Sequence, residues 1–171
     1  MGRKSTKENK TIYQQYRERE ELTREKAAEL LDVVSADRIE RIESEKLIPS
    51  PDDVIRMAEC YHAPELCNYY CSHQCPIGEK YVPEVEIHEL PNIILETVAS
   101  LNAINPLTNR LIEISRDGII SDDEIPDFAV IQNKLEQVSL AVNSLHLWVD
   151  RTISENNINI ELLEEYRKKY K

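Results

Sequence analysis

Residues 35–41 carry side chains that can contact the edges of nucleic acid bases. Arg38 or Arg41 can donate a bidentate pair of hydrogen bonds to guanine, and Asp37 can accept one from cytosine. Ser35 can contact a phosphate. An ordinary charged surface is the alternative, because acidic side chains make the segment less basic than a strong DNA reader. The candidate DNA-binding residues are Arg24, Ser35, Ala36, Asp37, Arg38 and Arg41.

The four cysteines and two of the four histidines lie between residues 60 and 75, which makes this segment a candidate metal site. In a continuous helix, Cys67 and Cys75 lie about 12 Å apart. Three cysteines can therefore bind one zinc ion only if the helix breaks after Cys71, and Pro76 favours such a break. An iron–sulfur cluster, a redox disulfide and simple packing of reduced thiols are the alternatives. The candidate ligands are Cys60, Cys67, Cys71 and Cys75, with His73 as a substitute.

The sequence carries no motif typical of an enzyme. It has no Gly-rich phosphate loop, no HExxH and no GxSxG nucleophile turn. His88 and His146 are isolated from other candidate catalytic groups. We therefore expect a protein without catalytic activity.

Two short helices joined by a tight turn position the candidate base-contacting residues. Thr23 can cap a helix over residues 24–31, and Ser35 can cap a second over residues 36–43, because a side-chain oxygen satisfies free backbone N–H groups there. The connection of about three residues forces a steep crossing, and Ala27 and Ala28 let the backbones approach. This spacing predicts a helix-turn-helix, whose second helix enters the major groove of DNA.

At these residues the sequence resembles the Xre-type, phage-repressor-like helix-turn-helix regulators, over residues 8–62. The matching positions are Leu22, Thr23, Ala28, Val34, Ser35, Ile39, Ile42, Glu43, Pro49, Val54, Ile55, Met57 and Ala58. Asp32 and Val33 stand where the family usually has Gly, with one extra turn residue. Glu45 stands at a second Gly position, and Pro51 replaces an apolar residue. The resemblance implies a lambda-repressor-like domain that binds double-stranded DNA, most simply as a dimeric repressor.

The remaining parts of this domain follow from apolar spacing. Residues 11–21 suit a first helix with Ile12, Tyr16 and, as a third candidate, Tyr13 turned inward. Arg17 and Arg19 are expected on a charged outer face, with contact to phosphates as the alternative. In the second helix, Ala27 and either Leu30 or Leu31 face inward. In the fourth, over residues 52–61, the residues expected to close the core are Val54, Ile55, Met57 and Ala58. Glu43 is expected to bond backbone or a basic side chain within the domain.

The sequence predicts an all-α protein in two parts. We expect a basic disordered arm (1–10), a DNA-binding domain (11–62), a Cys-rich helix and linker (63–91), and an acidic helical bundle for association or sensing (92–171). Ile94, Val98 and Leu101 share one face of a helix over residues 92–104. A narrow apolar seam on one long helix predicts packing in cis or a homodimer. The seam residues are Phe128, Ile131, Leu135, Val138, Val142, Leu145 and Val149.

The charge is unevenly distributed along the chain. Residues 1–50 hold eleven basic and eleven acidic side chains, so the net charge of −11 comes from residues 51–171. The acidic residues 51–171 repel the phosphates of DNA, so any DNA contact must come from one local face of the protein. The affinity for DNA should then fall as the salt concentration rises. No apolar run approaches the about 18 residues that span a bilayer, and the N-terminus lacks a signal core. We expect a cytoplasmic protein with no membrane contact.

These observations favour a sequence-specific DNA-binding transcriptional regulator that dimerises through its C-terminal helices. A dimer would present two recognition helices to major grooves about 34 Å apart. The alternative is a protein-interaction module, for example an antitoxin or adaptor that uses the same small domain to bind a protein partner. The acidic residues of the recognition helix favour that alternative.

Overall fold

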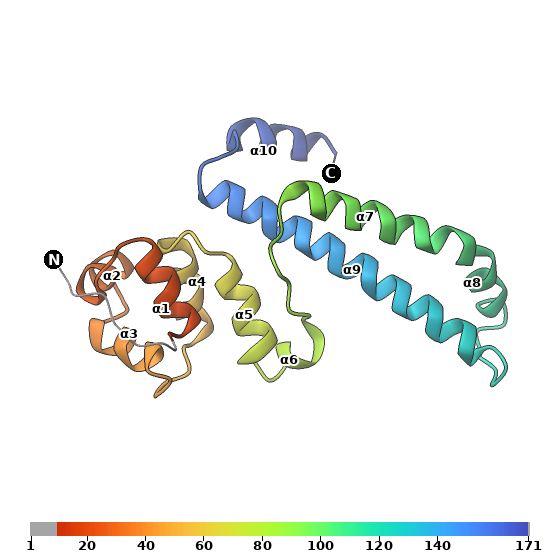
Figure 1. The fold of residues 1–171 in the computed structure, drawn as a ribbon, viewed down its shortest axis with the longest axis horizontal. Helices are drawn as coiled ribbons and strands as arrows, with labels where there is room; N and C mark the ends of the chain where they lie inside the picture. Colours follow the sequence, from red (N-terminus) through yellow and green to blue (C-terminus); the bar gives the residue numbers. More distant parts are fainter. Residues whose placement is uncertain (1–9, 171) are drawn as a thin grey trace. The chain divides into compact units, whose positions relative to one another are not determined.

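The computed structural model describes residues 10–170, and within them it contains helices and no strand (Figure 1). The α-helices are α1 (Ile12–Arg19), α2 (Arg24–Leu31), α3 (Ala36–Glu43), α4 (Pro51–Cys60), α5 (Glu65–His73), α6 (Gly78–Tyr81), α7 (Leu90–Ile104), α8 (Thr108–Ile114), α9 (Ile125–Ser154) and α10 (Ile160–Lys169). A short 3₁₀ helix, η1 (Asn105–Leu107), joins α7 to α8. The all-α prediction with one long C-terminal helix is confirmed.

The described residues form two compact units. Unit 1 lies within Met1–Glu84 and Asp150–Lys171, and unit 2 is Val85–Val149. The predicted basic arm falls outside the described residues except for Lys10, whose Nζ pairs with Glu18 at 2.7 Å. Among the helices of the described part, none is both long and apolar enough to cross a membrane.

Side-chain caps start each of the first four helices. The hydroxyl oxygens of Thr11, Thr23, Ser35 and Ser50 each accept a hydrogen bond from a backbone N–H in the first turn of the following helix. Asp53 completes a capping box at α4 by accepting from the Ser50 backbone N–H at 2.8 Å. The starts predicted for α2 and α3 are confirmed, because the capping signal acts within three residues.

One apolar core holds α1 to α5 together. Ala27, Ile39 and Met57 have no exposed surface, so α2, α3 and α4 meet without a gap. The burial predicted for Ile39 and Ile42 is confirmed. The core members are Tyr13, Ala27, Leu31, Val34, Ile39, Ile42, Val54, Met57, Ala58, Tyr61, Ala63 and Leu66.

The inward assignment of Ile55 was wrong, and the structure decides the inward residues of α2 and α1. Ile55 is 49 % exposed, because the neighbouring Val54 and Met57 occupy the inner face of α4. Leu31, not Leu30, faces inward from α2. In α1, Tyr13 is buried, whereas Ile12 and Tyr16 pack only partly against the core.

A buried ion-pair network joins α1, α2 and α3. Arg17 binds both oxygens of the Glu43 carboxylate, with its Nη2 donating to Oε2 at 2.9 Å, and Arg24 Nε donates to Oε2 at 2.8 Å. The Glu43 side chain is almost fully buried, so its charge depends on these partners. The structural role expected for Glu43 is confirmed. The outer-face position expected for Arg17 was wrong, because its guanidinium is buried against Glu43 and also donates to the Leu22 carbonyl.

Unit 2 consists of α7, η1, α8 and most of α9. Figure 1 shows α7 and α9 running in opposite directions, connected through η1 and α8. Arg110 on α8 donates to Asp127 on α9 at 2.7 Å. Few side chains of the unit are buried: Ile93, Ile114, Ile131, Ala141, Ser144 and Leu147. A unit of this size with so small a core leaves much of its apolar surface uncovered.

The apolar seam predicted on α9 is partly covered. Of its seven residues, Ile131 is buried, five are half-buried, and Leu135 is 45 % exposed. On α7, the face formed by Ile94, Val98 and Leu101 is also exposed. We call these four exposed side chains, Ile94, Val98, Leu101 and Leu135, the uncovered apolar surface of unit 2.

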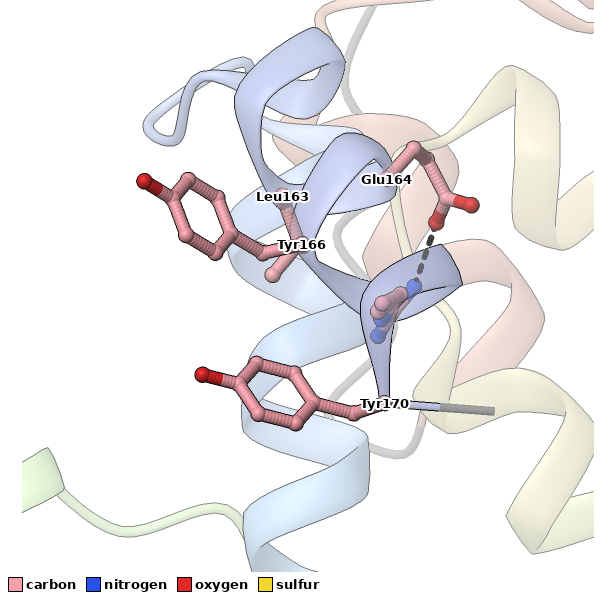
Figure 2. A pocket seen from close by; sticks show the side chains of 5 residues that line it. Leu163, Glu164, Tyr166 and Tyr170 are labelled. Atoms are coloured by element: carbon pink, nitrogen blue, oxygen red, sulfur yellow. Dashed lines mark hydrogen bonds and ion pairs between the residues drawn. The ribbon is translucent and has the colours of Figure 1, made fainter.

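The last helix, α10, is a short amphipathic helix capped by Asn159, whose side chain accepts from the Leu162 N–H at 3.0 Å. Figure 2 shows Tyr166 and Tyr170 projecting to the same side, beside Leu163. The ion pair between Glu164 and Arg167 at 2.8 Å is drawn with them. None of the α10 side chains is buried.

Replacing Glu43 by Gln should destabilise unit 1 strongly. The substitution removes the main charged partner of the buried Arg17 guanidinium and leaves only Glu18, 3.9 Å from its Nη2, among the described residues. Breaking a buried ion pair costs about 3–5 kcal/mol in comparable sites. We expect the midpoint of urea unfolding, followed by circular dichroism, to fall sharply. Glu40→Gln is the control, because Glu40 pairs only with the exposed Lys46 at 3.5 Å. Equal losses in the two variants would contradict a dominant role for Glu43.

Candidate nucleic-acid interface

The turn between α2 and α3 accommodates one extra residue by means of a strained backbone. Asp32 has φ 60° and ψ −48°, and the Val33 N–H donates to the Leu31 carbonyl at 2.7 Å. These values approach the three-residue γ-turn, which is rare for residues other than glycine. Val33 is 63 % exposed while Val34 is buried in the core. The turn therefore projects one valine outward and keeps α3 packed on α2.

A second strained residue stands after α3. Glu45 has φ 60°, a backbone conformation that favours glycine. The N–H groups of Lys46 and Leu47 both donate to the Arg41 carbonyl, at 2.9 and 3.1 Å, and so end the helix. Asp32, in the turn residues Asp32 and Val33, and Glu45 lie where the resembling family usually has glycine. The fold thus bears the steric cost of a Cβ at both turns.

Replacing Asp32 by Gly should stabilise unit 1. Relief of the positive φ is worth about 1–2 kcal/mol, partly offset by the greater freedom of glycine in the unfolded chain, which leaves about 1 kcal/mol. Urea unfolding followed by circular dichroism measures the difference. Glu29→Gly, at an exposed position within α2, is the control and should instead lower stability by about 1 kcal/mol. A destabilised Asp32→Gly variant would show that the turn is not strained.

The outer face of α3 carries the candidate base-contacting residues. Ser35, Asp37 and Arg41 are exposed, and Ala36 and Arg38 are half-buried. The Ser35 hydroxyl is already used as the cap, accepting from the Arg38 N–H at 3.2 Å. Within residues 10–170, Arg41 has no ion pair. It is therefore the cation on α3 that is most available to a ligand.

Arg38 is held by Asp53 at the start of α4. Its Nε lies 3.1 Å from both carboxylate oxygens, and its Nη2 donates to Oδ2 at 2.6 Å. Burial by itself would raise the pKa of Asp53, but hydrogen bonds from Arg38 and Ser50 outweigh it and lower the pKa. Asp53 is thus the charged anchor of Arg38.

Arg24, the candidate phosphate contact on α2, is also tied to the domain. Its Nε donates to Glu43, but over a third of its side chain stays exposed at the first turn of the helix. The structure therefore places Arg24, Arg38 and the exposed Arg41 in one small domain. Arg38 is paired with Asp53, and Arg24 shares the Glu43 carboxylate with Arg17. The charge of this face is close to balanced, because Asp37 and Glu40 also lie on α3.

The cysteines lie around α5. Cys60 and Cys67 pack against the core of unit 1. The helix ends at His73, so Cys75 lies beyond the helical face that holds Cys67 and Cys71. The nearby Gly78 is essential to the packing of α6, because a Cβ there would lie 2.0 Å from the Cys71 carbonyl oxygen. The break in the helix expected near Pro76 is therefore present, slightly earlier than predicted.

The thiols do not fit a metal site in their present arrangement. Among the described residues, no group of three or more His, Cys, Asp or Glu side chains is placed to hold a metal ion. Burial raises the pKa of the Cys60 and Cys67 thiols, which disfavours the thiolate that zinc and iron–sulfur clusters require. The simple packing of reduced thiols, one of the alternatives to a zinc site, accounts for the positions of Cys60 and Cys67 against the core. A zinc or iron–sulfur site stays a prediction from the sequence.

The sequence did not single out Asp53 as part of this interface. The pattern Ser50, Pro51, Asp52, Asp53 is a recognisable capping box and does place Asp53 in the first turn of α4. It carries no signal for the contact with Arg38, fifteen residues earlier.

Comparison with known proteins agrees with this geometry. Residues 14–66 match the family model described as a helix-turn-helix domain. Neither the curated proteins nor the solved structures contain a match to the chain. The segment from α1 to the start of α5 is therefore a helix-turn-helix domain, consistent with the N-terminal domain of Xre-type regulators. A helix-turn-helix domain is typical of DNA-binding regulators.

Proposed function

We propose that this protein is a sequence-specific DNA-binding transcriptional regulator that acts as a dimeric repressor. The observation that carries the proposal is the capped helix α3, presented by a helix-turn-helix domain with Arg41 exposed and unpaired among the described residues. In this proposal α3 enters the major groove, where Arg41 donates to guanine and Asp37 accepts from cytosine. Arg24 and Ser35 lie nearest the phosphates, and Ala36 packs against a base edge.

The balanced charge of α3 sets how such binding should behave. Asp37 and Glu40 oppose general attraction to phosphates, so affinity must depend on matched base contacts more than on charge. The protein should therefore bind non-specific DNA weakly and discriminate well. Repression follows most simply if a bound dimer occludes a promoter.

Arg41→Ala should lower the affinity for DNA at least about tenfold, the effect of losing one good bidentate base contact. Duplexes selected by the full chain from a random-sequence library are the probe, and fluorescence anisotropy at several salt concentrations is the measurement. Arg116→Ala is the matched control, because it removes the same charge from an exposed position in unit 2. Its affinity should stay within about twofold of the unmodified protein.

The opposite result would favour the protein-interaction module. In that case the full chain would enrich no DNA sequence, and a protein partner would co-purify with it in a salt-insensitive manner. The acidic side chains Asp37 and Glu40 on the outer face of α3 are the observation that supports this second candidate.

The uncovered apolar surface of unit 2 supports a homodimer. Ile94, Val98 and Leu101 on α7 and Leu135 on α9 are all about half exposed. Covering the exposed half of such side chains contributes roughly 1 kcal/mol each, and a symmetric interface counts each one twice. A second copy supplies a matching apolar surface of the same length. The dimer would then present two copies of α3 to successive major grooves, about 34 Å apart.

Leu135→Asp should convert the dimer to a monomer, because a carboxylate would be buried without a partner at the interface. Light scattering after size-exclusion chromatography gives the mass directly. Asn133→Asp adds the same charge to an exposed position on another side of α9 and should leave the dimer intact. If the unmodified protein is a monomer at micromolar concentration, dimerisation through unit 2 is wrong.

A further inference from the structure

The guanidinium of Arg38 is occupied along one edge and open along the other. Nε and one proton of Nη2 point to the Asp53 carboxylate, at 3.1 and 2.6 Å. Arginine has five N–H donors in a rigid planar fork, so Nη1 and the second proton of Nη2 remain for another acceptor. No other hydrogen bond from the Arg38 guanidinium is found in the part of the chain that the structure describes. The side chain is 38 % exposed, so this outer edge reaches solvent.

Asp53 is itself immobilised. Its Oδ2 accepts from the Ser50 backbone N–H and from the Ser50 hydroxyl, both at 2.8 Å, as part of the capping box of α4. Its side chain is only 10 % exposed. A carboxylate fixed at a helix start by two donors other than Arg38 cannot follow a moving Arg38 side chain. The position of Arg38 is therefore set by α4, although Arg38 belongs to α3.

We propose that Asp53 is a positioning residue that orients Arg38 to read one guanine of the DNA site. This inference rests on the proposed DNA-binding function. It adds that Arg38 binds a guanine through the O6 and N7 acceptors of that base in the major groove. The two acceptors match the two parallel donors on the outer edge of the guanidinium. Because Asp53 holds the side chain in one conformation, little rotamer entropy is lost when the base is bound.

The same contact explains how Arg38 differs from Arg41. The charge of Arg38 is compensated by a carboxylate at hydrogen-bonding distance, so the pair adds little general attraction to phosphates. Arg38 therefore contributes to the preference for one base over another rather than to the overall affinity for DNA. Arg41, which has no ion pair in residues 10–170, contributes both charge and contact.

A purely structural tie between α3 and α4 is the competing explanation of the pair. The two explanations differ in what the loss of Asp53 changes. A structural tie affects stability and lowers affinity for all DNA sequences alike. An orienting contact affects the ratio of affinities for two DNA duplexes that differ at one base pair.

The test uses the full chain and duplexes that it selects from a random-sequence library. The guanine read by Arg38 is identified as the position where Arg38→Lys loses preference, because lysine keeps the charge but has no fork of donors. The readout is the affinity for the selected duplex divided by the affinity for the duplex with adenine at that position. We expect a ratio of about tenfold or more for the unmodified protein.

Asp53→Asn should reduce this ratio toward one at the same position, without lowering the affinity for non-specific DNA. Asp53→Glu is the second variant: it keeps the capping box and the charge but displaces the carboxylate by one methylene, and it should also reduce the ratio. The double variant Arg38→Lys with Asp53→Asn should lose no more than either single variant. Thr11→Ala, which weakens the cap of α1 but leaves Ser50, Asp53 and Arg38 unchanged, is the control and should retain the ratio.

Two results would overturn the inference. If Asp53→Asn and Asp53→Glu keep the guanine preference, or lose affinity equally for both duplexes, the pair is a structural tie and the proposed function stands. If the unmodified protein enriches no sequence at all, the proposed function fails and the inference fails with it.

Discussion

The carboxylate of Glu43 is the constraint on which unit 1 depends. It sits at the end of α3, is almost fully buried, and accepts hydrogen bonds from Arg17 on α1 and Arg24 on α2. A buried charge is tolerated only when its partners are in place, so these contacts favour the packing of α1, α2 and α3 seen here. That arrangement leaves the outer face of α3 free. The network uses charge to specify geometry, and the apolar core supplies the stability.

The turns before and after α3 have strained backbone conformations. Asp32 and Glu45 have positive φ where glycine would be unstrained. The extra residue between α2 and α3 is absorbed by the bend at Asp32, with Val33 outside and Val34 in the core. Ala27 on α2 and Ile39 on α3 are completely buried in the core. Their close packing fixes the two helices and so holds the strained turns in place.

The two units differ in how completely they bury their apolar residues. Unit 1 encloses twelve apolar side chains in one cluster, and two of its cysteines pack against that cluster. Unit 2 leaves Val98 and Leu135 half exposed. A helix-turn-helix domain can fold around its own core, whereas a long helix with a continuous apolar seam needs a second surface of the same length. In the proposed function, recognition therefore falls to unit 1 and association to unit 2.

The sequence by itself determined the local features of the protein. Thr23 and Ser35 predicted the starts of α2 and α3, because a cap acts on backbone N–H groups only two or three residues away. The burial of Ile39 and Ile42 followed from helical periodicity, which repeats within one or two turns. The resemblance to Xre-type regulators, over residues 8–62, overlaps the segment 14–66 that the helix-turn-helix family model matches.

Only the tertiary structure decided which distant side chains meet. Arg17 looked like a surface charge, but the crossing of α1 over α3 buries it against Glu43, 26 residues later. Ile55 looked like a core residue, but the rotation of α4 turns it outward. Arg38 looked like a free cation, and the start of α4 brings Asp53 to it. Helix crossing and rotation depend on the packing of the whole core, and no local pattern of residues records them.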